Sequence, residues 1–472
     1  MILAKPRGNI AKLGSGIEGF DDITGGGIPR DRTTLLMGGP GCGKTVFALQ
    51  TLVHAAQHGT PGIFVAFEED AERVAANGDA FGWPMEELRK GKVDFVDARL
   101  RTDLVKAGPF DITGLLSALD TKVAAMGVGL VVFDAIDVLL NLLDDPSAEC
   151  HELYRLHDWL MRKGLTGIIT TKVSDDQHAT AQRYGFMPFM VDCAVLLTQR
   201  VTDRMAVRAL RILKYRGSAH VLNEVPFVIG PSGLEVGSSN GVHPEPQPFN
   251  ERVSTGVERL DAMLGGGVFR GTNVLLTGSC GGGKSMLAGN FIAAACRRDE
   301  RALYISFDEN SRDLVRDLAT MSIDLTPHLE SGLLRMEALR SESASSEEHF
   351  MRMKRLITEH QPRCVAIDPL SALARVGGGL AARSVAERLI YHCRNASITV
   401  VFTSLLEGSD PSLETTTLHI STLADSWIQI SYALVNGERK RALSIVKSRG
   451  SKHSGKLRDL IFSNQGITVA AP

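Results

Sequence analysis

Short apolar runs alternate with longer amphipathic stretches along the chain, and each run has the length of a strand. In the first half the runs cover residues 33–37, 62–67, 129–134, 166–170 and 194–199. Patterns with helical spacing lie between them, as at 45–58 and 150–163. In the second half the runs cover residues 272–277, 302–307, 363–368, 398–403 and 427–432. Near-continuous apolar strands that alternate with helices are typical of a mostly parallel sheet with helices on both faces, so the pattern predicts an α/β fold.

The two halves follow one design. Residues 15–45 and 255–285 align without a gap at an offset of 240, and their glycine triplets at 25–27 and 265–267 coincide. Matching motifs follow in the same order, and the offset has fallen only to 233 near the end of each half. A repeat unit of that size is a domain rather than a solenoid module.

The repeat also predicts the domain boundaries. We expect an N-terminal domain over residues 1–237 and a C-terminal domain over residues 251–472. Residues 238–250 between them are rich in Gly, Ser, Asn and Pro, and this composition predicts an extended linker.

Composition and charge narrow the class of protein. The 52 Lys and Arg residues against 54 Asp and Glu residues give a net charge of -2, which disfavours a dedicated nucleic-acid binder. No apolar run reaches the roughly 18 residues of a membrane helix, and the first residues lack the apolar core of a signal peptide. The seven cysteines form no C-x-x-C pair, which fits a reducing cytoplasm and argues against a zinc ribbon or a disulfide framework.

Two glycine-rich loops carry the strongest chemical signal. The segments GGPGCGKT at 38–45 and GSCGGGKS at 278–285 both fit G-x-x-x-x-G-K-[ST], and each follows an apolar run and opens a helical pattern. Such a loop directs successive N–H groups at phosphate oxygens, and a helix N-terminus adds a favourable dipole. A glycine-rich turn with a chance lysine is the alternative, which two matched copies disfavour.

We therefore expect one ATP and Mg²⁺ in each half. The residues expected at the phosphates are Gly39, Gly41, Gly43, Lys44, Gly281, Gly283 and Lys284. The hydroxyls of Thr45 and Ser285 are expected on Mg²⁺.

Acidic residues follow the strand-like runs in both halves. Asp134 and Asp368 end apolar runs and are candidates to hold the Mg²⁺ hydration shell, with a turn-starting aspartate as the alternative. The carboxyl ends of parallel strands face a ligand crevice, where a carboxylate can orient or deprotonate the attacking group. The candidates for this catalytic role are Glu68, Glu69, Asp308 and Glu309, and Asp308 is also expected near Mg²⁺. A solvated acidic turn is the alternative.

A cationic strand end recurs late in each half, and a solvated basic hairpin is its alternative. It suits contacts with the γ-phosphate or ribose, and a neighbouring subunit could receive it as an arginine finger. The residues are Arg208, Lys214, Arg216 and His220 in the first half, and Arg441, Lys447, Arg449 and His453 in the second.

These motifs together resemble the KaiC family, the ATPases and autokinases of the cyanobacterial circadian clock. The segment TTLHISTLADSW at 416–427 makes the resemblance close, because family members carry T-x-x-H-I-S-T in the second half. The resemblance spans residues 14–468 and implies two tandem RecA-like P-loop domains in a hexameric double ring, with ATP at the subunit interfaces. It implies autophosphorylation of Ser421 and Thr422, places Thr416 at the family's third hydroxyl, and leaves a KaiB-like partner open. An ordinary polar segment before a strand is the alternative.

The halves differ at the acceptor position. When they are anchored on Asp192 and Asp425, the residues opposite Ser421 and Thr422 are Pro188 and Phe189, which carry no hydroxyl. The phosphate of the first domain can therefore go only to water, so we expect that domain to hydrolyse ATP. The resemblance implies that the second domain phosphorylates its own Ser and Thr and can reverse that transfer.

Three departures from the family pattern change the expectations. Asp308 stands where the family usually has Glu as the presumed base, and Met321 stands where an aromatic near the adenine is usual. The sequence ends at Pro472, directly after a strand-like segment. The family's further tail serves the activator KaiA, so a KaiA-like activator is not expected.

Two other functions stay open. The first is a RecA- or helicase-type DNA-dependent ATPase, which a DNA-stimulated ATPase assay with varied salt would distinguish. The second is an ATP-dependent signalling scaffold without kinase activity, which would hydrolyse ATP without incorporating phosphate.

Overall fold

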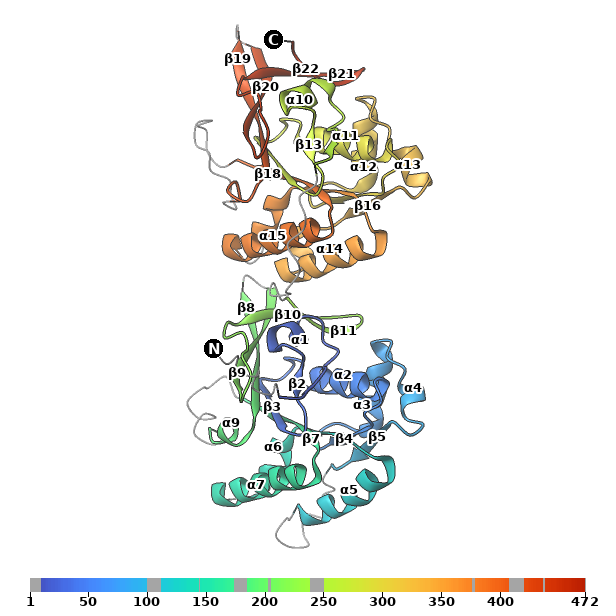
Figure 1. Ribbon diagram of the computed structural model, residues 1–472, viewed down its shortest axis with the longest axis vertical. Helices are drawn as coiled ribbons and strands as arrows, with labels where there is room; N and C mark the ends of the chain where they lie inside the picture. The colour runs from blue at the N-terminus through green and yellow to red at the C-terminus, as the bar shows by residue number, and fades with distance from the viewer. Residues whose placement is uncertain are drawn as a thin grey trace, which may run out of the picture. The chain divides into compact units, whose positions relative to one another are not determined.

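The computed structural model describes residues 10–99, 112–143, 145–173, 185–202, 205–237, 250–375, 378–406, 420–435 and 438–471 (Figure 1). The chain divides into two compact units, one built mainly from Met1–Val201 and Ala206–Gly241 and the other mainly from Val242–Pro472. No helix in the described ranges is both long and apolar enough to cross a membrane.

The first unit is built on a nine-stranded sheet with the order β11-β10-β9-β8-β3-β7-β6-β4-β5. Its strands are β3 (Thr33–Gly38), β4 (Gly62–Ala66), β5 (Val93–Asp97), β6 (Leu130–Asp134), β7 (Thr166–Lys172), β8 (Cys193–Thr202), β9 (Met205–Tyr215), β10 (Val225–Gly230) and β11 (Gly233–Val236). The pairs among β3 to β8 are parallel, whereas β9, β10 and β11 pair antiparallel. A separate antiparallel ribbon joins β1 (Lys12–Leu13) to β2 (Ile28–Pro29).

Helices cover both faces of this sheet. They are α1 (Phe20–Thr24), α2 (Lys44–Gln57), α3 (Ala71–Ala80), α4 (Met85–Leu88), α5 (Thr113–Met126), α6 (Ile136–Leu140), α7 (Pro146–Lys163) and α9 (Met187–Met190). Successive strand residues point to opposite faces, so Leu36 packs with the core under α2 and Leu35 with the core under α7. Figure 1 shows the same layering, with α2 and α3 on one side of the sheet and α5 and α7 on the other. Because both faces are buried, the strands read as continuous apolar runs.

The second unit repeats this topology. Its sheet has the order β16-β15-β17-β18-β14-β19-β20-β21-β22. The strands are β14 (Asn273–Gly278), β15 (Ala302–Ser306), β16 (Leu334–Ala338), β17 (Cys364–Asp368), β18 (Thr399–Leu405), β19 (Ser426–Val435), β20 (Glu438–Ser448), β21 (Arg458–Ser463) and β22 (Gly466–Val469), beside a ribbon of β12 (Arg252–Val253) and β13 (Val268–Phe269).

The helices of the second unit also lie in two layers (Figure 1). They are α10 (Glu258–Met263), α11 (Lys284–Cys296), α12 (Ser311–Ala319), α13 (Thr326–Glu330), α14 (Ser346–His360) and α15 (Gly378–Asn395), with 3-10 turns η1 (Ser341–Ser343) and η2 (Leu370–Arg375). Two tandem RecA-like α/β domains with mostly parallel sheets are thereby confirmed.

Candidate functional sites at the two P-loops

The first P-loop joins β3 to α2 and has the backbone that its sequence predicts. Gly41 and Gly43 adopt φ of 70° and 97°, a left-handed region that favours glycine, so the loop can curl in front of α2. The Lys44 ammonium donates to the carbonyl oxygens of Gly38 at 2.8 Å and Gly39 at 2.9 Å. These contacts hold the lysine across the loop, where a phosphate would lie.

Asp134 at the end of β6 is tied to the P-loop. Its Oδ2 accepts a hydrogen bond from the Thr45 hydroxyl at 2.8 Å, and its Oδ1 accepts one from Thr170 at 2.6 Å. Burial raises the pKa of the Asp134 carboxyl, while the hydrogen bonds from Thr170 and Thr45 oppose that rise. The Thr45 hydroxyl and the Asp134 carboxylate offer oxygen ligands. Such ligands suit Mg²⁺, which keeps several waters and also binds phosphate oxygens.

The acidic pair after β4 is partly engaged by neighbours. The Lys172 ammonium at the end of β7 lies 2.5 Å from the Glu68 carboxylate, and this hydrogen bond raises the pKa of Lys172. Glu69 accepts a hydrogen bond from Asn77 at 3.2 Å. Glu68 therefore faces the carboxyl ends of the strands, and Glu69 turns toward α3.

The second P-loop joins β14 to α11 and opens into a pocket of about 330 Å³. The Lys284 ammonium donates to the carbonyl oxygens of Gly278 at 3.0 Å and Ser279 at 2.9 Å, and burial lowers its pKa. The predicted residues that line this pocket are Gly281, Gly283, Lys284, Ser285, Asp308, Glu309, Asp368 and Arg441. The fold thus brings residues from four distant segments together, as one nucleotide site requires.

Asp368 has different donors from Asp134. Its Oδ2 accepts a hydrogen bond from the Tyr304 hydroxyl at 2.6 Å, and its Oδ1 accepts one from Thr403. Burial, followed by the charge of Asp368, raises the pKa of Tyr304 well above its ordinary value. Within the described ranges, no hydrogen bond joins Ser285 to Asp368.

The acidic pair after β15 is held by a guanidinium. Arg375 at the end of η2 donates two hydrogen bonds to the Asp308 carboxylate, at 2.8 and 3.3 Å. Glu309 is free of such a bridge among the described residues, and burial, followed by the charge of Asp368, raises its pKa.

Two residues of each late cationic segment lie at the predicted acceptor position rather than at the P-loop of their own unit. In the second unit the Lys447 ammonium donates to the carbonyl oxygens of Ser421 at 3.4 Å and Thr422 at 3.2 Å, and Arg449 donates to that of Thr422 at 2.8 Å. In the first unit Lys214 and Arg216 make the matching contacts with Pro188 and Phe189. Burial lowers the pKa of both lysines.

The remaining predicted residues of these segments have other partners. Arg441 lies at the second P-loop and donates to the Gly281 carbonyl at 3.3 Å, whereas Arg208 donates to Gln199 at 3.2 Å. The rings of His220 and His453 contact the backbone carbonyls of Ser218 and Ser451 at 3.4 and 3.5 Å.

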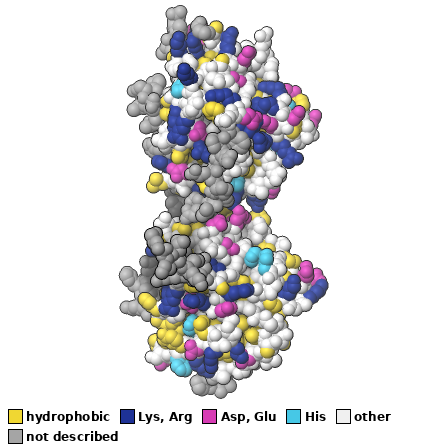
Figure 2. Space-filling view, in the orientation of Figure 1, with side chains coloured by type: hydrophobic (Ala, Val, Ile, Leu, Met, Phe, Trp, Pro, Cys, Tyr) yellow, Lys and Arg dark blue, Asp and Glu magenta, His cyan; other side chains and the backbone are white. Residues whose placement is uncertain are grey.

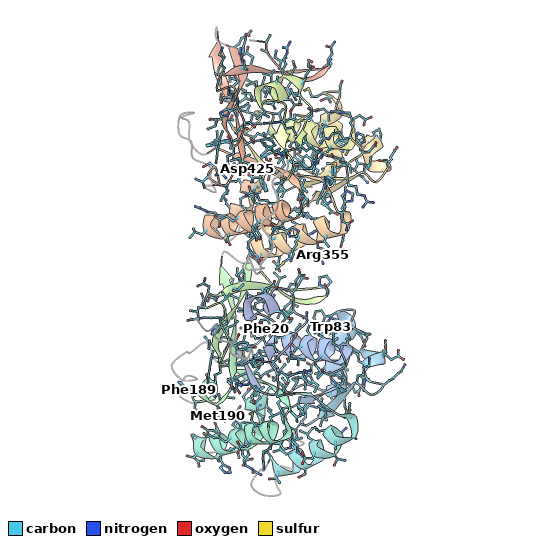
Figure 3. The ribbon with its side chains drawn as sticks, viewed as in Figure 1. Phe20, Trp83, Phe189, Met190, Arg355 and Asp425 are labelled. Carbon is cyan, nitrogen blue, oxygen red and sulfur yellow. The ribbon has the colours of Figure 1, made fainter. Side chains whose placement is uncertain are left out.

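The segments at the predicted acceptor position are partly exposed. Ser421 is half-buried and Thr422 is exposed, whereas Thr416 lies outside the described residues. In the first unit Phe189 is 76% exposed, and Figure 3 places it with Met190 at the edge formed by α9. Apolar side chains gather at this edge of the first unit in Figure 2. Figure 3 also labels Asp425. Its backbone carbonyl accepts a hydrogen bond from the backbone N–H of Arg449 at 2.8 Å.

Sequence reasoning missed aromatic residues of the second site, among them Phe462 and Tyr304. Phe462 on β21 lines the P-loop pocket with Met321, and the Arg441 guanidinium lies 5.0 Å from its ring. The pocket therefore has an aromatic wall although Met321 is not aromatic. Tyr304 was hidden in an apolar run, and the only available signal was its alignment with Phe64 at the offset of 240.

Comparison with known proteins agrees with this geometry. The family model described as "ATPase: KaiC" matches the chain twice, at residues 13–241 and 253–472. The circadian clock protein KaiC2 of Synechocystis sp. is 35% identical over 467 residues, which cover 98% of this chain and 82% of that protein. The circadian clock oscillator protein KaiC of Prochlorococcus marinus is 35% identical over 463 residues, which cover 98% of this chain and 92% of that protein. With two matches to the family model and full-length relatives at this identity, the chain belongs to the KaiC family of ATPases.

Proposed function

We propose that the first domain (residues 1–237) hydrolyses ATP and that the second (residues 251–472) transfers the γ-phosphate of ATP to its own Ser421 and Thr422 and can reverse the transfer. As a member of an ATPase family, the chain binds ATP. One observation supports the assignment of different activities to the two domains. In both units a matching Lys and Arg pair hydrogen-bonds to the backbone of the segment at the predicted acceptor position, and only the segment of the second unit carries hydroxyls there.

The residues of each P-loop have separate roles in this proposal. Lys44 and Lys284 stabilise charge on the β- and γ-phosphates, and Thr45 and Ser285 would hold Mg²⁺ with Asp134 and Asp368 behind them. Mg²⁺, when bound, supplies charge stabilisation at the transferred phosphate. Glu68 orients water in the first site, and Asp308 accepts the proton of the attacking hydroxyl in the second, with Glu309 in support.

We propose further that the sites are completed between subunits of a hexameric double ring. Lys447 and Arg449 lie on the acceptor segment and do not line the pocket of their own P-loop. In a ring these residues and the acceptor hydroxyls would be presented to the nucleotide of the neighbouring subunit, as an arginine finger is.

The cellular setting belongs to the same proposal. All seven cysteines are free thiols, which supports a reducing compartment such as the cytoplasm. The relatives are named as circadian clock proteins, and we propose a timing or stress-signalling role with a KaiB-like partner.

Replacement of both acceptors tests the autokinase. The double variant Ser421→Ala and Thr422→Ala should lose most phosphate incorporated from ATP labelled in its γ-phosphate, and should keep ATP hydrolysis, because the first site has its own P-loop. Phosphopeptide mapping and a phosphate-release assay measure the two activities. Ser331→Ala removes an exposed hydroxyl elsewhere and is the matched control. Undiminished labelling of the double variant would refute the assignment.

A further inference from the structure

The magnesium-facing aspartates of the two domains differ in one hydrogen bond. In the first domain the Thr45 hydroxyl donates to Asp134 Oδ2 at 2.8 Å. This bond points the hydroxyl proton at the carboxylate and leaves the oxygen lone pairs directed away from Asp134. Thr45 is therefore oriented for a metal before the metal arrives.

In the second domain the matching carboxylate oxygen, Asp368 Oδ2, accepts its hydrogen bond from a buried core residue instead. The Tyr304 hydroxyl donates to Asp368 Oδ2 at 2.6 Å, while Thr403 serves Oδ1 as Thr170 does in the first domain. No hydrogen bond within the described ranges joins Asp368 to Ser285, so the Ser285 hydroxyl is not oriented in the same way.

The difference comes from one atom at matched positions. Tyr304 on β15 pairs with Ala366, two residues before Asp368, and Phe64 on β4 pairs with Val132, two residues before Asp134. Both rings are fully buried, and only Tyr304 carries a hydroxyl.

We propose that Tyr304 is a positioning residue that makes the second nucleotide site require more Mg²⁺ than the first. By holding Asp368 Oδ2 from the core side, Tyr304 leaves Ser285 to be oriented only when the metal binds. A net hydrogen bond corresponds to about a two- to tenfold change in an equilibrium constant, and this is the expected ratio of half-saturating Mg²⁺ concentrations. The inference rests on the proposed binding of Mg·ATP at both P-loops.

A reciprocal pair of substitutions tests the inference in the intact chain. Binding of a fluorescent methylanthraniloyl-ATP is measured while free Mg²⁺ is varied, with EDTA as the metal-free limit. The wild-type protein should fill half of its sites at low Mg²⁺ and half at higher Mg²⁺. Tyr304→Phe should move the second phase toward the first, and Phe64→Tyr should move the first phase toward the second, each by about two- to tenfold.

The outcomes are distinguishable. A purely structural role for Tyr304 would change the unfolding temperature in EDTA without changing the Mg²⁺ dependence of nucleotide binding, and that result would overturn the proposal. If Tyr304→Phe does not fold, the Phe64→Tyr variant tests the proposal alone. An unchanged Mg²⁺ dependence of nucleotide binding in Phe64→Tyr also overturns the proposal. Absence of any nucleotide binding by the wild-type protein would instead contradict the proposed function.

Discussion

Glu68 and Asp308 occupy matching positions but contact cations from different elements. Lys172 at the end of β7 contacts Glu68, whereas Arg375 at the end of η2 holds Asp308 with two hydrogen bonds. A planar guanidinium fixes a carboxylate more firmly than an ammonium does. The shorter Asp308 side chain is therefore held in one orientation at the edge of the pocket.

Removal of the Asp308 charge tests this residue as the base of the second site. Asp308→Asn should lower phosphate incorporation into Ser421 and Thr422 by about a hundred- to ten-thousandfold, because the amide cannot accept the hydroxyl proton. The rate of labelling under single-turnover conditions is the measurement. Glu330→Gln, at an exposed acid on α13, is the control and should leave labelling unchanged. A variant that labels at the wild-type rate would exclude Asp308 as the base.

Glu309 gives a pH-dependent prediction. Burial raises its pKa above the ordinary 4.5, so ionisation is less favourable in the folded than in the unfolded protein. A raised pKa stabilises the fold below the unfolded value and loses that contribution as the pH rises through the folded value. In EDTA without nucleotide, the unfolding temperature of the wild type should therefore fall relative to that of Glu309→Gln as the pH rises from 4.5. Parallel curves for the two proteins would contradict the prediction.

At the scale of elements, each P-loop with its following helix is a separate phosphate-binding unit. Lys44 begins α2 and Lys284 begins α11, and each ammonium donates to two carbonyl oxygens of its own loop. Gly283 adopts a φ of 101°, and a Cβ there would lie 2.2 Å from the Phe462 ring. The loop and β21 therefore fit only with glycine at that position.

The two lysines should separate the two activities. Lys284→Ala should abolish phosphate incorporation, and Lys44→Ala should lower ATP hydrolysis and ring assembly, because each lysine serves the phosphates of its own domain. Parallel assays of labelling, phosphate release and sedimentation measure the three properties. Persistent labelling of Ser421 or Thr422 in Lys284→Ala would show that the domains are wrongly assigned.

At the scale of the whole molecule, both halves place a Lys and Arg pair at the predicted acceptor position. In the first unit the pair is Lys214 and Arg216, which contact Pro188 and Phe189. Within the described ranges neither side chain hydrogen-bonds to the first P-loop. This placement favours a nucleotide site shared between subunits.

Mixed assemblies test the sharing. Lys44→Ala and Lys214→Ala subunits should each hydrolyse ATP poorly alone, and their mixture should recover part of the activity, because some interfaces then combine two intact faces. Phosphate release after co-assembly is the measurement. A mixture that is no more active than the two proteins measured separately would indicate a site completed within one chain.

The α/β class, the duplication and the two P-loops follow from local patterns. Strands buried on both faces must be apolar along their whole length, and a phosphate-binding turn needs glycines and a lysine at set spacings, so short windows such as 38–45 contain this information. Exposed positions interrupt the apolar pattern in the antiparallel strands β20 and β21, so the strand-like segment before Pro472 did not show that it forms two strands, β21 and β22.

Contacts between distant segments were decided by the tertiary structure. Lys447 reaches the acceptor carbonyls from a neighbouring strand, Arg375 reaches Asp308 from η2, and Phe462 completes the pocket opposite Met321. Tyr304 looks like any core residue of an apolar strand until its hydroxyl is seen on Asp368, 64 residues away. The hydrogen-bond partner of a polar side chain depends on the order of the strands and on the direction of the side chain. The residues that neighbour it in the sequence determine neither of these.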